Sequence, residues 1–337
     1  MSFINKCSTI IRLSNQEILN IYNDNNIKFE YFDKNKNLLY SNTISNSSDL
    51  DFTNSYFNLS SDDSIYGIYK NNSLNLIEIK NKGSEIIKNE ILNYNYKKFD
   101  IIFPYIKILN NDIHILYYVY NNNSPNTCAL FHHYKEGKIW NENKIDFINH
   151  IVLDNFKVLW INNNPIVFYF KLVNGYEEVF SSRFNNSTLG WSNPIQITNS
   201  GRNKLYLSIL KDNMNFYHLT FCENVDNGYA VKYINGYLNE YNLDINISSY
   251  ISKPSTCRFP NLIKHKSNLY LIWADHERLY SCNSSDLGKT WTNPIIDNFS
   301  LYEDFTRANF ISNYKDDSNY NVSNVFTISN KIDIIGF

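Results

Sequence analysis

Three arginines are the residues of this sequence whose positions best suit the binding of a ligand. Arg202, Arg258 and Arg307 each stand at, or just ahead of, the start of a short apolar segment that predicts a strand. A guanidinium group can donate two parallel hydrogen bonds to a carboxylate or a phosphate, so converging arginines form an anion clamp. Acidic segments lie close by at residues 275–278 and 302–304. The pattern favours a site for an anion; the alternative is that these arginines pair with loop carboxylates and only support packing.

The other reactive residue types form no recognised catalytic or metal-binding pattern. His132 and His133 are adjacent, so in a strand they would point to opposite faces, and no carboxylate stands at ligand spacing from them. His114 and His218 lie inside apolar segments and are predicted to be buried in the core. The sequence has no glycine-rich phosphate loop and no serine nucleophile elbow. We therefore expect no cofactor and no metal site.

The composition predicts an all-β chain. The 337 residues include 27 tyrosines and 22 phenylalanines, and isoleucine, valine and aromatic residues recur in short runs that are typical of strands. The five cysteines are widely spaced and odd in number, which predicts buried reduced thiols rather than a disulfide framework. The net charge of −2 carries no block of like charge, which argues against a nucleic-acid partner. No apolar run is long enough to span a bilayer.

Glycines mark a repeat of about fifty residues. Gly83, Gly137, Gly190, Gly236 and Gly288 are separated by 54, 53, 46 and 52 residues, and a similar turn at 33–37 precedes them. Each interval holds four short strand-like segments; those of the sixth repeat are residues 258–263, 269–273, 279–282 and 291–295. Such a period predicts an array of four-stranded units.

One of these turns carries a longer motif. Residues 284–291 read Ser-Ser-Asp-Leu-Gly-Lys-Thr-Trp. Asp286 can accept hydrogen bonds from its own turn, Gly288 can adopt a positive φ, and Trp291 can fold beneath the turn as an apolar plug. The segment resembles the Asp-box, or BNR repeat, of the sialidase-like β-propellers, and partial copies end at Trp140 and Trp191. The resemblance implies an all-β propeller of four-stranded antiparallel blades.

Two blade counts are compatible with the end of the chain. Residues 307–311, 324–328 and 331–335 would be three strands of a seventh blade, and the segment Phe3-Ile4 could supply its fourth strand and close the ring. We predict seven blades. The alternative is six, the number found in sialidases, with the tail padding the ring. Either count predicts a single domain over residues 1–337.

The resemblance also implies a site. In sialidases an arginine triad binds the substrate carboxylate, a tyrosine assisted by a glutamate is the nucleophile, and an aspartate is the acid and base. Here Arg202, Arg258 and Arg307 would form the triad. Tyr302 with Glu303 would be the nucleophile pair, and Asp275 the acid and base. The site is expected on the face opposite the Asp-box turns.

Two functions follow as hypotheses. The preferred one is a non-enzymatic recognition or scaffold propeller that binds a glycan, a peptide or a partner protein. The reason is that sialidases carry an arginine motif near the start of the propeller, whereas this chain has Ile10-Ile11-Arg12-Leu13-Ser14 there. The alternative is an exo-glycosidase of sialidase type with the arginine clamp. Residues 1–7 contain no apolar leader segment. We therefore expect a cytoplasmic protein, or one that assembles onto a cell surface or spore envelope.

Overall fold

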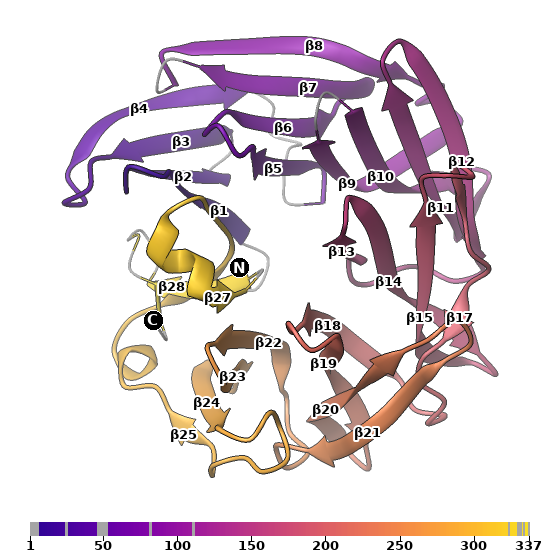
Figure 1. The fold of residues 1–337 in the computed structure, drawn as a ribbon, viewed down its shortest axis with the longest axis vertical. Helices are drawn as coiled ribbons and strands as arrows, with labels where there is room; N and C mark the ends of the chain where they lie inside the picture. Colours follow the sequence, from indigo (N-terminus) through magenta and orange to yellow (C-terminus); the bar gives the residue numbers. More distant parts are fainter. Residues whose placement is uncertain are drawn as a thin grey trace. The chain divides into compact units, whose positions relative to one another are not determined.

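The computed structural model describes residues 7–23, 26–45, 53–80, 83–109, 112–322, 324–328, 332 and 334–335. These residues form six β-sheets in chain order, which we call blades 1 to 6, and the fold class is that of a six-bladed β-propeller (Figure 1). The chain divides into two compact units. Unit 1 comprises the described residues of 1–147, 304–318 and 323–337, and unit 2 comprises 148–303 and 319–322. The prediction of an all-β propeller is confirmed; the single domain stays a prediction.

Unit 1 contains blades 1 to 3, each with four antiparallel strands in sequential order. Blade 1 has β1 (Cys7–Arg12), β2 (Ile18–Asn23), β3 (Ile27–Phe32) and β4 (Leu38–Ser45). Blade 2 has β5 (Ser55–Leu59), β6 (Ile65–Lys70), β7 (Ser73–Lys80) and β8 (Glu85–Asn93). Blade 3 has β9 (Phe99–Leu109), β10 (Asp112–Asn121), β11 (Ser124–Glu136) and β12 (Ile139–Ile148).

The tail of the chain extends blade 1, so the prediction of seven blades is wrong and the six-blade alternative is supported. Strand β26 (Phe305–Ser312) pairs in parallel with β1, from Cys7 opposite Arg307 to Arg12 opposite Ser312. Strands β28 (Asn324–Ile328) and β29 (Ile334–Ile335) continue the same sheet. The reason is that β1 presents an open edge, and the tail satisfies its backbone groups there instead of starting a new sheet. The segment Phe3-Ile4 lies outside the described residues.

Unit 2 contains blades 4 to 6. Blade 4 has β13 (Lys157–Ile161), β14 (Asn164–Val173), β15 (Tyr176–Asn185) and two short outer strands, β16 (Gly190–Trp191) and β17 (Ile195–Gln196). Blade 5 has β18 (Lys204–Lys211), β19 (Phe216–Val225), β20 (Gly228–Leu238) and β21 (Leu243–Tyr250). Blade 6 has β22 (Arg258–His265), β23 (Asn268–Asp275), β24 (Arg278–Ser284) and β25 (Ile295–Ile296), with β27 (Tyr320–Asn321) paired to β22.

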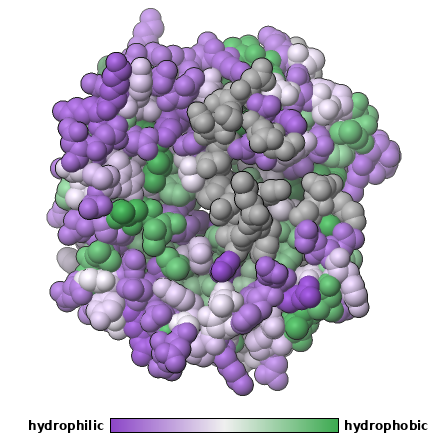
Figure 2. Space-filling model, turned by 180° about the vertical axis from the view of Figure 1, so that it is seen from behind, coloured by the Kyte–Doolittle hydropathy of each residue, from purple (hydrophilic) through white to green (hydrophobic). Residues whose placement is uncertain are grey.

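The second strand of each blade in unit 2 is buried on both faces, as its continuous apolar sequence predicts. In β19 the run from Tyr217 to Glu223 is buried throughout, and Leu219 has no exposed surface. Burying one such side chain contributes about 1.5–3 kcal/mol to folding. Polar turn residues remain outside, and the face in Figure 2 is mostly hydrophilic with separate apolar patches.

The predicted geometry of the turn at 284–291 is present. Asp286 accepts hydrogen bonds from the backbone N–H and the hydroxyl of Thr290, at 2.9 and 2.7 Å, and these bonds lower the pKa of Asp286 to about 2. Gly288 has a φ of +86°, and a Cβ there would lie 2.1 Å from the hydroxyl of Tyr233 in blade 5. The ring of Trp291 lies 5.0 Å from that of Tyr233. The turn of blade 6 therefore packs against Tyr233 of blade 5.

Three inner strands share a β-bulge at an aromatic residue. Phe103, Tyr206 and Phe259 have φ values of +52°, +63° and +50°, and each lies where the register of β9, β18 or β22 shifts. Positive φ is costly for a bulky residue, so the bulges are specific features rather than random irregularities. In unit 2 the rings of Tyr206 and Phe259 lie 4.2 Å apart and join the inner strands of blades 5 and 6.

Candidate functional site

The two ends of the blades in unit 2 differ in what they carry. We call the end with the Asp-box turn the lower end. Strands β15, β18 and β22 begin at the opposite, upper end, and β19, β21 and β23 finish there. The pairing of Lys204 with Glu223 and the hydrogen bond from Thr256 to Asp275 belong to this upper end. This is the end on which the sequence predicted a site.

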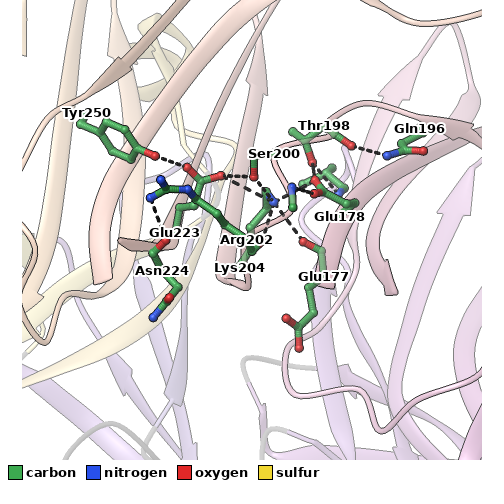
Figure 3. Close-up of polar contacts among 12 residues, drawn as sticks. Glu177, Glu178, Gln196, Thr198, Ser200, Arg202, Lys204, Glu223, Asn224 and Tyr250 are labelled. Carbon is green, nitrogen blue, oxygen red and sulfur yellow. Dashed lines mark hydrogen bonds and ion pairs between the residues drawn. The ribbon is translucent and has the colours of Figure 1, made fainter. Parts of the chain in front are cut away.

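A completely buried lysine lies at the centre of the upper end of blades 4 and 5 (Figure 3). The ammonium group of Lys204 lies 2.8 Å from Glu178 Oε2 and 3.6 Å from Glu223 Oε1. The two glutamate side chains are only 1% and 3% exposed. Lys204 Nζ also donates to Ser200 Oγ at 2.8 Å and to the carbonyl oxygens of Glu177 and Arg202 at 3.1 and 2.7 Å.

Both glutamates have further hydrogen-bond donors, which is what makes burial of three charges tolerable. Glu178 accepts bonds from Thr198 Oγ1 at 2.5 Å and from the N–H of Gly201 at 2.8 Å. Glu223 accepts bonds from Ser200 Oγ at 2.7 Å and from the hydroxyl of Tyr250. The cluster thus ties the loop at 198–203 to the strand ends of two blades.

Tyr250 connects this buried cluster to solvent. Its side chain is 44% exposed, and its hydroxyl donates to Glu223. The ammonium of Lys232 lies 4.0 Å from the centre of its ring. Burial, followed by the hydrogen bond and negative charge of Glu223, raises the pKa of Tyr250 to about 12. The phenol is therefore protonated at neutral pH.

Arg202 lies beside this pair (Figure 3). It is exposed, and its Nη1 donates to the carbonyl of Asn224 at 3.4 Å. Its positive charge acts on Tyr250 in the direction that lowers the pKa, against the larger effect of burial. Because a guanidinium group has five donor hydrogens, Arg202 keeps capacity for an anionic ligand.

A third carboxylate at the upper end is not neutralised by the lysine. Glu177 Oε2 is buried and has no hydrogen-bond partner among the described residues. After burial, the charge of Glu177 is the next largest cause of the raised pKa of Tyr229. An acceptor of this kind suits a hydroxyl group or a proton of a ligand.

The structure brings some of the predicted arginines to one end and leaves the triad a prediction. Arg202 and Arg258 both lie at the upper end of unit 2, on the adjacent blades 5 and 6. Arg258 is exposed and is the first residue of β22, paired with Ala274. Arg307 lies within β26 and belongs to unit 1.

The predicted nucleophile pair lies in the loop that follows the last outer strand of blade 6. Tyr302 is 88% exposed and follows the 3-10 turn η3 (Phe299–Leu301), while the N–H of Glu303 donates to the Phe299 carbonyl at 2.9 Å. In unit 2 a tyrosine–glutamate hydrogen bond lies elsewhere, from Tyr250 to Glu223. The nucleophile role of Tyr302 and Glu303 stays a prediction.

Asp275 is heavily engaged with its own surroundings. Its Oδ1 accepts bonds from the hydroxyls of Ser255 and Thr256, both at 2.9 Å, and from the N–H of Thr256 at 3.2 Å. The imidazole of His276 lies 2.9 Å from the same oxygen, and the Asp275 side chain is 13% exposed. These contacts hold the loop ahead of β22, and the acid–base role of Asp275 stays a prediction.

Sequence reasoning missed the cluster because its members lie far apart in the chain. Glu178, Lys204, Glu223 and Tyr250 come from four different strands of two blades. One signal was available: Glu178 and Glu223 sit directly beside apolar residues in segments that otherwise read as buried strands. A charge in such a position requires a partner of opposite charge, and Lys204 is a lysine at the start of a strand of the same kind.

Two other predictions concern groups elsewhere. His114 and His218 are buried, as predicted, and His132 and His133 are buried as well. Among the described residues, no three histidine, cysteine or acidic side chains are grouped so as to hold a metal ion. In the same part of the chain, no helix is long and apolar enough to cross a membrane.

The chain matches no protein-family model and no curated protein, but its fold is similar to several solved structures. An ulvan lyase of polysaccharide lyase family PL25, bound to GlcA(1-4)Rha3S, has a TM-score of 0.62 and 10% identity over 97% of this chain and 95% of its own. The polysaccharide lyase Uly1 has a TM-score of 0.58 and 9% identity over 89% and 83%. A GH93 α-L-arabinofuranosidase of Fusarium graminearum, with arabinobiose, has a TM-score of 0.51 and 10% identity over 82% and 92%.

These comparisons agree with the β-propeller fold and correct the preferred function. The hypothesis of a non-enzymatic recognition or scaffold propeller is contradicted, because the three similar structures above are two polysaccharide lyases and an arabinofuranosidase. The hypothesis had rested on an incomplete sialidase pattern, which speaks against one enzyme family and not against enzymes in general. The sialidase-like family itself stays a prediction.

Proposed function

We propose that this protein is a carbohydrate-active enzyme that cleaves an acidic glycan at the upper end of blades 4 and 5. The observation that carries the proposal is the half-exposed Tyr250, hydrogen-bonded to Glu223 beside the exposed Arg202. The arrangement combines a proton donor with a cation for a carboxylate group. The similar fold of a lyase bound to a glycan with GlcA, a uronic acid, supports the choice of substrate class.

The geometry favours elimination over hydrolysis by paired carboxylates. Hydrolysis of that type needs one glutamic acid to protonate the leaving group and a second carboxylate to face the sugar. Glu178 and Glu223 are buried and share one ammonium group, so neither is presented to a substrate. Elimination from a uronate needs instead a cation on the carboxylate, a base for the adjacent C–H and a proton for the leaving oxygen.

In the proposed reaction Arg202 binds the uronate carboxylate, which makes the proton on the neighbouring carbon more acidic. A base removes that proton, and Glu177 is our candidate because its buried oxygen lacks a partner among the described residues. The C–H electron pair forms a carbon–carbon double bond as the glycosidic C–O bond breaks. Tyr250 protonates the leaving oxygen, and Glu223, fixed by Lys204, positions the phenol.

A sialidase-like exo-glycosidase is the second candidate. Its support is the presence of Arg202 and Arg258 at one end of unit 2, together with a tyrosine–glutamate hydrogen bond like that of the sialidase nucleophile. In this version Tyr250, rather than Tyr302, would attack the sugar. The products distinguish the two reactions: elimination leaves an unsaturated uronate that absorbs ultraviolet light, and hydrolysis does not.

The test is a screen of uronate-containing polysaccharides, including one of glucuronate and sulfated rhamnose, beside a fluorogenic sialoside. Tyr250→Phe is expected to lower kcat by about 10²-fold or more, because general acid–base groups contribute on that scale. Arg202→Ala is expected mainly to raise KM. Tyr96→Phe is the matched control, since Tyr96 is 46% exposed and belongs to unit 1, and it should retain activity. Absence of turnover on every acidic glycan, or full activity of Tyr250→Phe, would overturn the proposal.

A further inference from the structure

The lower end of blades 4 and 5 contains a groove of about 1240 Å³, entirely within unit 2. The turns between β13 and β14, β15 and β16, β18 and β19, and β20 and β21 contribute to its walls. The groove arises where the outer edge of blade 4 is short: β16 and β17 have two residues each, whereas β21 of blade 5 has eight. Ser181, a small residue, faces this space from β15.

Aromatic side chains line the groove and its rim. Tyr241, in the turn after β20, is 82% exposed, and Tyr237, near the end of β20, is 49% exposed. Trp191, the tryptophan of the partial Asp-box, packs against Phe184 at 5.5 Å between ring centres and also borders the groove. Aromatic faces combined with a few directed polar groups are the usual composition of a ligand site.

The polar groups of the groove include buried atoms without partners. Ser181 is fully buried, and its hydroxyl has no hydrogen-bond partner among the described residues. Arg183 donates from Nη2 to the Leu238 carbonyl at 2.8 Å, while its buried Nε has no partner in the described part of the chain. Buried polar groups are rarely left unsatisfied, so these atoms point to a hydrogen-bonding ligand. Asparagine side chains also line the groove, at Asn162, Asn164, Asn185, Asn193, Asn215 and Asn239.

We propose that this groove is a second glycan-binding site. Sugar rings would stack on Tyr241 and Trp191, and hydroxyl groups would bond to Ser181, Arg183 and the asparagine amides. Two cations, Arg183 and Lys211, against one acid, Glu240, favour an acidic glycan. The choice of a glycan rests on the substrate class of the proposed function, but not on the chemistry assigned to Tyr250.

The groove is separate from the candidate active site. Strand β18 runs from Lys204 at the upper end to Lys211 in the groove, over eight residues. At about 3.3 Å per residue, the two sites lie about 23 Å apart along the strand. A short oligosaccharide therefore reaches one site only, whereas a polysaccharide can be held at the groove while another segment is cleaved.

The experiment measures binding and turnover separately with the full chain. Retardation of the protein in gels containing acidic or neutral polysaccharides reports binding, and the variants are Tyr241→Ala, Trp191→Ala and Arg183→Gln. Tyr302→Ala is the control, because it removes an exposed tyrosine outside the groove. We expect at least a tenfold loss of affinity for the acidic polymer in Tyr241→Ala, with an unchanged unfolding midpoint because the side chain is 82% exposed.

The outcomes separate this inference from the proposed function. If an acidic polymer is cleaved, Tyr241→Ala should raise KM for the polymer and leave turnover of a short oligosaccharide unchanged. If nothing is cleaved, loss of retardation in Tyr241→Ala but not in Tyr302→Ala still supports the groove. Unchanged retardation of all three groove variants overturns it, and so does the absence of any retardation of the unaltered protein. An equal loss of activity on short and long substrates also overturns the separation of the sites.

Discussion

Replacing Lys204 by methionine tests the energetics of the buried cluster. The substitution removes an ammonium with no exposed surface from between Glu178 and Glu223, which are 1% and 3% exposed. Removing one partner of a buried ion pair typically costs about 3–5 kcal/mol, because the remaining charge is left uncompensated. Here two carboxylates remain, and each keeps two hydrogen bonds from other donors. We expect the free energy of unfolding to fall by about 3–5 kcal/mol at neutral pH.

The loss should depend on pH in a defined direction. Without Lys204 two neighbouring carboxylates share a medium of low polarity with no compensating positive charge. In acid one of them can take up a proton, so the folded variant binds protons more readily than its unfolded chain. Its stability relative to the unaltered protein should therefore recover as the pH falls towards about 4, the ordinary range of glutamic acid.

Urea titrations at about pH 7.5 and about pH 5, followed by tryptophan fluorescence, measure the effect. Lys211→Met is the matched control, since Lys211 ends the same strand and is only half-buried. It should change stability by no more than about 0.5 kcal/mol. Adding Glu178→Gln to Lys204→Met should restore part of the loss. The reasoning would be refuted if Lys204→Met lowered the free energy of unfolding by less than about 1 kcal/mol. It would also be refuted if adding Glu178→Gln to Lys204→Met lowered that free energy further.

Two further predictions concern His114 in blade 3 and Gly288 in blade 6. Burial lowers the pKa of His114 to about 4, and His114 Nδ1 lies 3.1 Å from His132 Nε2, so both rings are neutral in the folded chain. The unfolded chain protonates first, at its ordinary pKa near 6.5. Stability should therefore fall by about 3 kcal/mol for His114 as the pH drops from 6.5 to 4. His114→Gln should show a shallower fall in its thermal midpoint, and an equal slope would contradict the assignment. Gly288→Ala should destabilise by about 1–3 kcal/mol, since its φ is +86° and a Cβ would lie 2.1 Å from the Tyr233 hydroxyl. Gly137→Ala, with φ +57° and no atom within 4 Å of its Cβ, should lose less in the same urea titration; equal losses would show that contact with Tyr233 is unimportant.

The features that the sequence predicts correctly are local ones. Runs such as Phe216–Val225 identify buried strands because their apolar character is continuous, and the motif around Asp286 defines a turn through its own hydrogen bonds. The glycines that mark the repeat do not all lie in turns. Gly236 lies inside β20 at a bulge, where a Cβ would be 2.2 Å from the Asp244 carbonyl oxygen, rather than in a turn.

What the sequence does not predict depends on partners that are distant in the chain. The number of blades depends on whether residues 305–312 pair with a new strand or with β1. The sequence of these residues has the same pattern of apolar side chains in either case. The buried cluster around Lys204 was not predicted for the same reason. Tyr302 and Glu303 are neighbours in sequence but share no hydrogen bond that the structure shows, whereas Tyr250 and Glu223 are 27 residues apart and do. Adjacency in the chain was a poor guide to contact across blades.

The parallel pairing of β1 with β26 has a consequence for the biosynthesis of unit 1. Cys7 pairs with Arg307, 300 residues later, so β1 emerges from the ribosome long before its partner exists. At translation rates of about 5–20 residues per second, the interval is about 15–60 s. Closing so long a loop costs about 5 kcal/mol of chain entropy. During synthesis the nascent chain therefore exposes an unpaired strand edge that can pair with another chain, and chaperone binding near residues 7–12 would protect it until β26 is made.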